Sequence, residues 1–322
     1  MINSLKTKKI LVTGGAGFIG SHIVQRLLKE GNSVVVLDNF FSGKRENLSF
    51  VNDLTLGDGQ YRLIEGDIRN YDDCLQSCKG VNVIFHQAAL RSVPRSFNNP
   101  YDYNEVNING MLNVLEAAKA NKVKRVVFAS SSSIYGDTDK FPQTEGQYPL
   151  LISPYALSKL TGEYYCRIYS QNFGLETVSL RYFNVFGPRQ ALDDDYAVVI
   201  PKFIDCILKD RQPPIHGTGK QSRDFTYIDN VVEANILAAV TVGVGGSVLN
   251  VACGKTHSIL DLVEIINKTT NKSIKPVFTP PRVGDVFRTH ADISQAQALL
   301  GFKPAVEFEE GLKRTVEWVE NK

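Results

Sequence analysis

A tyrosine and a lysine four residues apart are the side chains of this sequence best suited to proton transfer. Tyr155 and Lys159 stand at the start of residues 155–173, whose pattern predicts a long helix. Residues four apart share one face of a helix. A phenol with a pKa of roughly 10 is a poor base near neutral pH, and a neighbouring ammonium group lowers that pKa by stabilising the phenolate. The pair indicates a general acid–base, although many helix faces carry Tyr and Lys without any catalytic role.

A run of serines provides a second group of polar side chains. Ser130, Ser131, Ser132 and Ser133 follow residues 125–129, in which Arg125 precedes an apolar run that predicts a buried strand. Parallel sheets bind their ligands at the carboxyl ends of the strands. Serine hydroxyls placed there can donate hydrogen bonds to a substrate oxygen or accept them. Beside the tyrosine–lysine pair, the run favours an active site over the alternative of a polar loop.

The stretch that must position these groups lies near the N-terminus, in residues 9–38. An apolar strand leads into a turn that contains Gly14, Gly17 and Gly20, and a helix and a second apolar strand follow. Gly14 permits the turn, Gly17 lets a diphosphate approach the backbone, and Gly20 allows close packing of the helix. The N–H groups at the helix N-terminus would face the phosphates. A glycine-rich turn without a ligand is the alternative.

An acidic residue at the end of the second strand predicts the cofactor. Asp38 stands where a carboxylate takes the hydroxyls of an adenosine ribose. It would repel a 2′-phosphate, so NAD is favoured over NADP. Lys44 and Arg45 follow shortly afterwards and could meet such a phosphate, which keeps NADP as an alternative.

The composition argues against several other functions. The 322 residues include 36 basic and 34 acidic ones, so no overall charge favours nucleic acid or a membrane surface. No apolar run reaches the roughly twenty residues that span a bilayer, and the N-terminus has no apolar signal core, so we expect a cytoplasmic protein. The five cysteines favour reduced thiols over disulfides or zinc. The histidines have no metal-like spacing, and we expect no metal.

Apolar strands alternate with helices as far as residue 184. This pattern predicts a Rossmann-like α/β fold, a doubly wound parallel sheet covered on both faces. The pattern then changes, and two helical stretches are expected between residues 258 and 322. We expect a cofactor domain of residues 1–184 plus about 223–256, and a smaller mixed α/β substrate domain of about 185–222 plus 257–322.

Several short motifs occur together along the whole chain. They are Gly14-x-x-Gly17-x-x-Gly20, Asp67-Ile68, His86-Gln87-Ala88-Ala89, Asn107, Ser131-x-x-x-Tyr135-Gly136, Tyr155-x-x-x-Lys159 and Arg181-Tyr182-Phe183-Asn184. In this combination the chain resembles the extended short-chain dehydrogenase/reductase family and, within it, the nucleotide-sugar 4-epimerases of the UDP-galactose and UDP-N-acetylglucosamine type. The resemblance implies NAD as the cofactor, a UDP-sugar as the substrate, and inversion at C4 through a transient 4-keto sugar.

The resemblance also implies roles for individual residues. Tyr155 would take the proton of the sugar 4-hydroxyl, Ser131 would bond that hydroxyl, and Lys159 would bond the nicotinamide ribose; these three are the expected catalytic residues. The expected cofactor-binding residues are Gly14, Gly17, Phe18, Ile19, Asp38, Asn39, Asp67, Ile68, Gln87, Ala88, Ala89, Asn107, Tyr155, Lys159 and Tyr182. The expected substrate-binding residues are Arg91, Ser92, Ser131, Ser132, Ser133, Tyr155, Asn184, Val199, Phe203, Arg223, Arg282, Asp285 and Thr289.

Other reactions of the same family remain alternatives. By resemblance, dehydratases carry Asp-Glu directly after the residue that matches Ser131, and decarboxylases carry a Glu there. This chain has Ser132 and Ser133, whose hydroxyls are not acids or bases near neutral pH. Epimerisation is therefore favoured over dehydration or decarboxylation. A UDP-glucuronate epimerase and a non-catalytic NAD-binding sensor are further alternatives, and the intact catalytic residues argue against the sensor.

The preferred sugar depends on one position of the pocket. Residues 91–96 resemble epimerases that act on N-acetylated hexosamines. An alignment with the family places Thr289 where enzymes restricted to plain hexoses carry a bulky aromatic residue. We therefore expect room for an acetamido group, and activity on UDP-N-acetylglucosamine/UDP-N-acetylgalactosamine as well as on UDP-glucose/UDP-galactose. The alternative is that the alignment slips by one and Thr289 lies off the pocket.

The resemblance finally implies a homodimer. The family commonly dimerises through two long helices, here about residues 104–121 and 155–173, which pair with their copies as a four-helix bundle.

Overall fold

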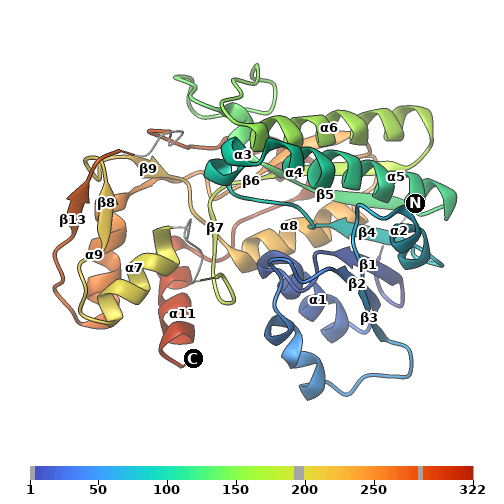
Figure 1. Ribbon diagram of the computed structural model, residues 1–322, viewed down its shortest axis with the longest axis horizontal. Coiled ribbons are helices and arrows are strands. Elements are labelled where there is room, and N and C mark those ends of the chain that lie inside the picture. The colour runs from blue at the N-terminus through green and yellow to red at the C-terminus, as the bar shows by residue number, and fades with distance from the viewer. Residues whose placement is uncertain (1–3, 192–198, 282–285, 322) are drawn as a thin grey trace.

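The computed structural model describes residues 4–191, 199–281 and 286–321 (Figure 1). Its centre is a parallel sheet of seven strands in the order β11-β6-β5-β4-β1-β2-β3. This sheet confirms the predicted Rossmann-like α/β fold. Its strands are β1 (Lys9–Thr13), β2 (Ser33–Asp38), β3 (Tyr61–Glu65), β4 (Val83–His86), β5 (Arg125–Ser131), β6 (Glu176–Tyr182) and β11 (Ser247–Val251).

The central strands are apolar without interruption because both faces of the sheet are covered. Along β1, Ile10 and Val12 point into one buried cluster and Leu11 points into the other. Neighbouring residues of a strand face opposite sides, so a strand buried on both sides needs apolar residues at every position.

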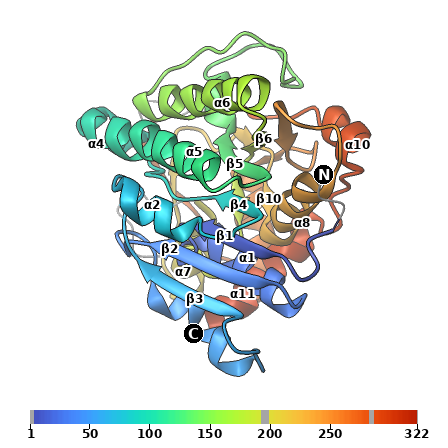
Figure 2. The ribbon, with the colours of Figure 1, turned by 90° about the vertical axis from the view of Figure 1, so that its right-hand side faces the viewer.

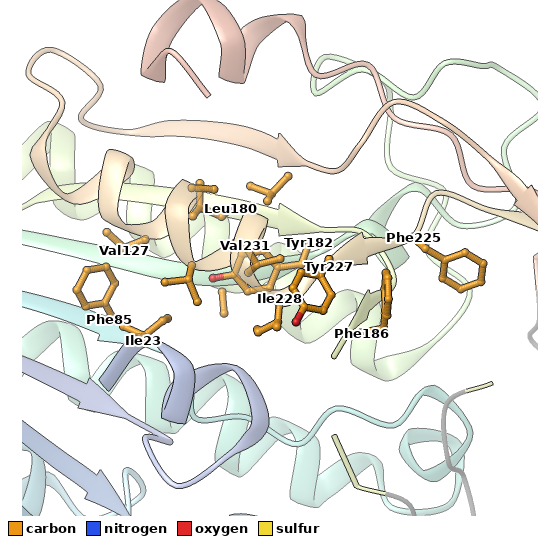
Figure 3. Packing of buried hydrophobic residues seen from close by; sticks show 14 of the residues in the cluster. Ile23, Phe85, Val127, Leu180, Tyr182, Phe186, Phe225, Tyr227, Ile228 and Val231 are labelled. Atoms are coloured by element: carbon orange, nitrogen blue, oxygen red, sulfur yellow. The ribbon is translucent and has the colours of Figure 1, made fainter. Parts of the chain in front are cut away.

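Different helices cover the two faces of the sheet (Figure 2). One face carries α2 (Tyr71–Ser77), α5 (Gly110–Ala120) and α6 (Pro154–Asn172), and the other carries α1 (Phe18–Lys29) and α8 (Ile228–Val240). Figure 3 shows Ile23 of α1 and Val231 of α8 beside Phe85, Val127 and Leu180 of the sheet. This packing fixes the strand ends that carry the polar side chains discussed below.

A second region, on the left in Figure 1, gathers later segments of the chain. It contains α7 (Val199–Leu208) and α9 (Ile259–Thr270) with the paired strands β8 (Pro214–His216) and β13 (Val277–Thr279). The remaining pairs are β7 (Val185–Phe186) with β10 (Thr226–Tyr227) and β9 (Ser222–Arg223) with β12 (His257–Ser258). Helix α11 (Phe308–Glu320) follows α10 (Ser294–Leu300). One buried cluster runs from β1 into α7 and α9, so the two regions share a continuous core.

The C-terminal part differs from the sequence prediction. We predicted two helical stretches after residue 258, but the described residues of this part form three helices, α9, α10 and α11. Helix α10 has only seven residues, which is too short for an apolar period of 3.6 residues to show in the sequence.

The helix predicted over residues 104–121 is also divided. It consists of α4 (Pro100–Asn104), a π-helical turn η2 (Glu105–Asn109) and α5. Helix α3 (Val93–Asn98), which we did not predict, precedes it and begins at Ser92, whose hydroxyl accepts the N–H of Arg95. The 3₁₀ segments η1 (Arg45–Asp53) and η3 (Ser132–Tyr135) were not predicted either. Within the described ranges, no helix combines the length and the apolar character needed to cross a membrane.

Candidate active site

Two adjoining cavities open at the carboxyl ends of the sheet strands. The first has a volume of about 550 Å³ and the second of about 500 Å³. Tyr155, Tyr182 and Arg91 line both, so the cavities meet at these side chains. The first cavity contains the strand-end residues of β1, β2 and β3, and the serine run after β5 faces the second. The site thus lies where an open parallel sheet binds its ligands.

The glycine turn after β1 forms one wall of the first cavity. Gly14 has φ +68°, and a Cβ there would lie 2.7 Å from the backbone nitrogen of Ala88. A Cβ on Gly20 would lie 2.1 Å from the carbonyl oxygen of Gly14, so the helix and the turn approach too closely for any side chain. Gly17 is the N-cap of α1 and has no side-chain capping bond. The first N–H groups of the helix are therefore left to a ligand, which fits a diphosphate.

The acidic residue at the end of β2 closes the same wall. Asp38 is buried, and its carboxylate accepts the N–H of Ala16 at 2.9 Å and that of Phe40 at 2.8 Å. Burial raises the pKa of Asp38 and the two hydrogen bonds lower it. The carboxylate therefore ties the glycine turn to the strand end. Lys44, one of the two cations that kept NADP open, also lines this cavity.

A second acid lies at the far end of the cavity. Asp67 pairs with Arg69, with 2.7 Å between Oδ2 and Nη2, and accepts the amide of Asn39 at 2.8 Å. The hydrogen bonds from Arg69 outweigh burial and lower the pKa of Asp67 to about 2. Asp67 is thus a carboxylate at any physiological pH, and with Ile68 it lines the cavity beyond Asp38.

Helix α6 carries the predicted proton-transfer pair to the junction of the cavities. Ser153 caps it by accepting the N–H of Ala156 at 3.1 Å, and Pro154 is its first residue. Lys159, one turn after Tyr155, donates from Nζ to the carbonyl oxygen of Ala129 in β5 at 2.8 Å. This bond joins α6 to the strand that ends in Ser131. Ser131 and Tyr155 both line the second cavity, and the Ser131 side chain opposes the effect of burial on the pKa of Tyr155.

The serine run is ordered from within. The hydroxyl of Ser133 donates to Oγ of Ser131 at 2.9 Å, and the N–H of Ser133 approaches the same oxygen at 3.2 Å. Ser131, Ser132 and Ser133 all line the second cavity. Tyr155 lines this cavity as well, and Lys159 lines the first one, so the three predicted catalytic residues lie around the junction of the cavities. Their catalytic role stays a prediction.

The electrostatics of this group differ from the sequence expectation. We expected Lys159 to lower the pKa of Tyr155. Burial instead raises the pKa of Tyr155, and the opposing effects come from the Ser131 hydrogen bond and from the charge of Arg91. Burial also lowers the pKa of Lys159 to about 7. Formation of the phenolate therefore needs additional positive charge in the cleft.

The second cavity contains most of the predicted substrate residues. Arg91, Ser92, Asn184, Val199 and Phe203 line it, as do Arg223 and Thr289. Apolar side chains of α7 stand opposite polar groups from the strand ends. Arg282 and Asp285 lie outside the described residues.

Two predicted cofactor residues hold other groups in place. Asn107 is buried behind the cleft, where its amide accepts the N–H of Leu90 at 2.8 Å and donates to Oγ of Ser158 at 3.0 Å. The hydroxyl of Tyr182 donates to Oδ1 of Asn235 at 2.9 Å while its ring lines both cavities. The other predicted cofactor residues line the first cavity: Gly14, Gly17, Phe18, Ile19, Asp38, Asn39, Asp67, Ile68, Gln87, Ala88, Ala89, Tyr155 and Lys159.

Asp224 is a site residue that the sequence prediction missed. It is fully buried, and its carboxylate accepts the N–H groups of Cys253 at 2.9 Å, Gly254 at 3.0 Å and Ala291 at 3.3 Å. Its own N–H donates to Oγ1 of Thr289 at 3.2 Å. Asp224 thus joins its own segment to two others, one at residues 253–254 and one at residues 289–291, beside the second cavity.

The neighbours of Asp224 complete this junction. The amide of Asn184 donates to the carbonyl oxygen of Asp224 at 3.0 Å and to Oγ1 of Thr289 at 2.9 Å. Arg223 is held by the carbonyl oxygens of Ser222 and Phe287. The only sequence signal for Asp224 was its place beside Arg223. Gln190, which lines both cavities, gave no signal at all.

His86 lies behind the site and is fixed as a neutral ring. Its Nδ1 lies 2.7 Å from Oγ1 of Thr13, and burial, with a smaller effect from the charge of Lys159, lowers its pKa to about 3. Among the residues that the structure describes, no three His, Cys, Asp or Glu side chains gather as metal ligands would.

Comparison with known proteins identifies the family of the chain. The model of the NAD dependent epimerase/dehydratase family matches residues 10–252. The chain belongs to this family. A UDP-glucose 4-epimerase of Mycolicibacterium smegmatis is 37% identical over 317 residues, which cover 98% of this chain and 99% of that protein.

Solved structures of the family are similar over their whole length. The UDP-N-acetylglucosamine 4-epimerase of Methanobrevibacter ruminantium, in complex with UDP-N-acetylmuramic acid, has a TM-score of 0.92 and 42% identity, covering 98% of this chain and 99% of that one. The UDP-glucose 4-epimerase of Thermus thermophilus, in complex with NAD, has a TM-score of 0.87 and 35% identity, covering 97% and 99%.

Relatives with other reactions are almost as similar. A UDP-N-acetyl-alpha-D-glucosaminuronate decarboxylase of Bacillus cytotoxicus is 35% identical and covers 97% of each chain. A UDP-glucuronate 4-epimerase of Thermodesulfobacterium geofontis is also 35% identical, covering 96% of this chain and 95% of that protein. The family members thus share the fold while their named reactions differ.

The burial of Asp224 predicts a pH-dependent stability. Burial raises its pKa from 3.8 to about 7, so the folded state binds a proton more tightly than the unfolded state. The contribution of this group is fully present below about pH 4 and is lost as the pH rises through 7. Chemical denaturation of wild type and Asp224→Asn should differ in their pH slopes between pH 4 and 7, by up to about 1.4 kcal/mol per pH unit.

The exposed Asp58 provides a matched control for this measurement, because Asp58→Asn removes a carboxylate that makes no such buried contacts. Its pH slope should equal that of the wild type. Identical slopes for wild type and Asp224→Asn would contradict the raised pKa.

Proposed function

We propose that this chain inverts C4 of a UDP-hexose with NAD as its bound cofactor. The observation that carries the proposal is the position of Tyr155, which lines both cavities and shares the second one with Ser131. A sugar in the second cavity and a dinucleotide in the first would both reach this side chain. The NAD complexes of related structures support the choice of cofactor.

The glycine turn and Asp38 fit the proposed cofactor. The uncapped N-terminus of α1 would bind the diphosphate, and Asp38 would accept the ribose hydroxyls. A carboxylate there disfavours a 2′-phosphate, which supports NAD over NADP. When bound, NAD supplies the group that accepts the hydride from C4 and returns it.

The residues of the chain would then move the proton. Tyr155 takes it from the sugar 4-hydroxyl as the 4-keto sugar forms and returns it after the sugar has turned in the cavity. Ser131 holds the same oxygen, and Lys159 holds the nicotinamide ribose. Because burial raises the pKa of Tyr155, the positive charges of the cleft must stabilise the phenolate.

The absence of acids favours epimerisation over the other reactions of the family. The described residues that line the second cavity include no Asp or Glu. Ser132 and Ser133 occupy the positions where dehydratases and decarboxylases carry acids. The similarity to a glucuronate epimerase keeps a uronate substrate as the second candidate, because Arg91 lines the sugar cavity and could pair with a carboxylate.

N-acetylated and plain UDP-hexoses are both proposed as substrates. Thr289 lines the second cavity and contributes a small side chain, which supports space for an acetamido group. The similarity to a UDP-N-acetylglucosamine 4-epimerase supports the same choice.

We propose the domain division given by the sequence, with a cofactor domain of residues 1–184 plus about 223–256 and a nucleotide-sugar domain of about 185–222 plus 257–322. The division is supported by the linings: almost every residue of the first cavity precedes residue 185, and α7, β8 and Thr289 line only the second. A cytoplasmic location is proposed from the sequence and agrees with five cysteines that are all free.

A homodimer through α5 and α6 is also proposed. Leu157, Tyr164 and Ile168 of α6 are 52%, 56% and 44% exposed, and their spacing of seven and four residues places them on one helix face. Tyr101 belongs to α4, which precedes α5 in the sequence, and its side chain is 85% exposed. Such an apolar stripe supports a contact with a second copy.

Loss of the Tyr155 hydroxyl tests the proposed reaction. Tyr155→Phe should lower kcat for C4 inversion by roughly 10²- to 10⁴-fold, the range for a general acid–base, while the amount of NAD bound per chain stays near the wild-type value. Product formation from several UDP-sugars is followed by NMR. Tyr148→Phe, at a tyrosine that is 84% exposed, is the matched control and should retain full activity; full activity of Tyr155→Phe would end the assignment.

A bulky residue at position 289 tests the proposed sugar range. Thr289→Tyr should lose UDP-N-acetylglucosamine and UDP-N-acetylgalactosamine selectively, because the ring would occupy the acetamido space. Ratios of kcat/KM for N-acetylated and plain sugars measure the effect. Thr289→Ser keeps the hydroxyl that Asn184 and Asp224 contact and should keep the ratio; an unchanged ratio in Thr289→Tyr would reject the idea.

Charges on the α6 stripe test the proposed dimer. The double variant Leu157→Glu/Ile168→Glu should elute as a monomer in light-scattering chromatography, because a dimer would bury four carboxylates. Val242→Glu is the control, because Val242 lies outside this helix and is 46% exposed, much like the stripe residues. This variant should leave the mass unchanged. A wild type that is monomeric at micromolar concentration would remove the proposal.

A further inference from the structure

Arg189 is a cation in the wall of the first cavity whose observed partners are neutral. Its Nη1 lies 3.4 Å from Oγ of Ser21, its Nη2 donates to the side-chain oxygen of Gln25, and its guanidinium lies 4.9 Å from the ring centroid of Phe50. Among the described residues, none forms an ion pair with it. Burial lowers its pKa, which means that its positive charge is poorly solvated. A cation in such surroundings gains stability from an anionic ligand.

The backbone at Arg189 is held in an unfavourable conformation that brings the side chain to α1. Its φ is +66°, in the left-handed region that side chains rarely adopt. The loop is fixed on both sides: Nε2 of His22 lies 2.9 Å from the carbonyl oxygen of Pro188, and Gln190 donates to the carbonyl oxygen of Val185 at 2.9 Å. A strained residue fixed by its neighbours is characteristic of functional sites.

The contacts of Arg189 place it beside the diphosphate end of α1. Ser21, His22 and Gln25, which hold the loop, belong to the first two turns of α1, and this helix begins after the uncapped Gly17. The positive end of the helix and the guanidinium therefore act on the same part of the cavity. Two anionic phosphates would meet both charges there.

We propose that Arg189 binds the diphosphate of the dinucleotide cofactor, opposite the N–H groups of the glycine turn. The proposal rests on the proposed NAD site and extends it to a residue outside the glycine motif. Arg189 lines only the first cavity, whereas Arg223 lines only the second. Arg223, which is buried, is available to the diphosphate of a nucleotide-sugar in the second cavity, and the half-buried Arg189 is left to the diphosphate of the dinucleotide in the first.

The inference is tested by binding, with no need for turnover. NAD, ADP, 2′-AMP and adenosine are titrated into wild type and Arg189→Gln, with displacement of the bound NAD measured for each. Arg189→Gln should weaken ADP and NAD by roughly 10- to 100-fold, the range of a charge-assisted hydrogen bond, and leave adenosine within twofold of wild type. Arg189→Lys should restore part of the loss, since it returns the charge without the planar fork.

An exposed arginine provides the matched control. Arg211→Gln removes an equal charge at an exposed arginine paired with Asp205 and should leave ADP affinity unchanged. Unchanged ADP affinity in Arg189→Gln, or an equal loss for ADP and adenosine, would overturn the role of Arg189 while the proposed function stands. Weaker binding of 2′-AMP by Arg189→Gln, with unchanged binding of ADP, would also overturn the role of Arg189. A wild type that binds neither NAD nor ADP would overturn the proposed function and this inference together.

Discussion

The contact between α6 and the end of β5 is the interaction on which the site depends. Lys159 donates to the carbonyl oxygen of Ala129 at 2.8 Å. This bond fixes the helix on the strand, and Tyr155, one helical turn earlier, lines the second cavity together with Ser131. The consequence is that one phenol stands where the two cavities meet. The glycine turn, Asp38 and the α7 wall then arrange the rest of the cleft around that group.

This arrangement places a proton-transfer group in surroundings that oppose its ionisation. Burial raises the pKa of Tyr155 and lowers that of Lys159 to about 7. Both shifts favour the neutral forms, so charges that enter the cleft with a ligand would change the ionisation of the pair. A site of this kind couples ionisation to the binding of its ligands. Asp224 is a second buried acid in this region. Three N–H donors from the segments that it joins offset the free-energy cost of burying its carboxylate.

Much of the fold could be predicted from the sequence because both faces of the sheet are covered. Continuous apolar runs at β1, β2 and β5 carry that signal directly. The second region could be predicted only in outline. Strands β8 and β13 have three residues each, and helix α10 has seven, so their apolar patterns are too short to show a period. The π-helical turn at Glu105–Asn109 contains no Gly or Pro itself, and the Gly110 that follows it begins the next helix, so nothing in the sequence predicted the interruption.

The site residues likewise divide into those that could be placed from the sequence and those that could not. Residues that follow strands, such as Asp38 and Ser131, could be placed from sequence because parallel strands end at one edge of the sheet. Asp224 could not, since its role comes from contacts with Cys253, Gly254 and Ala291, which lie far along the chain. The resemblance located Thr289 beside the cavity, but the sequence could not show that its hydroxyl is already bonded to two neighbours. The electrostatics were also out of reach, because the pKa of Tyr155 depends on burial.

The fate of a label at C4 tests the central claim most directly. UDP-sugar carrying deuterium at C4 is incubated with the full chain, and the product is analysed by NMR and mass spectrometry. If Tyr155 transfers the proton while the sugar stays bound against the dinucleotide, the inverted product should retain its deuterium at C4 with no exchange into solvent. Inverted product that has lost the label to water, or labelled substrate that is never inverted, would contradict the account.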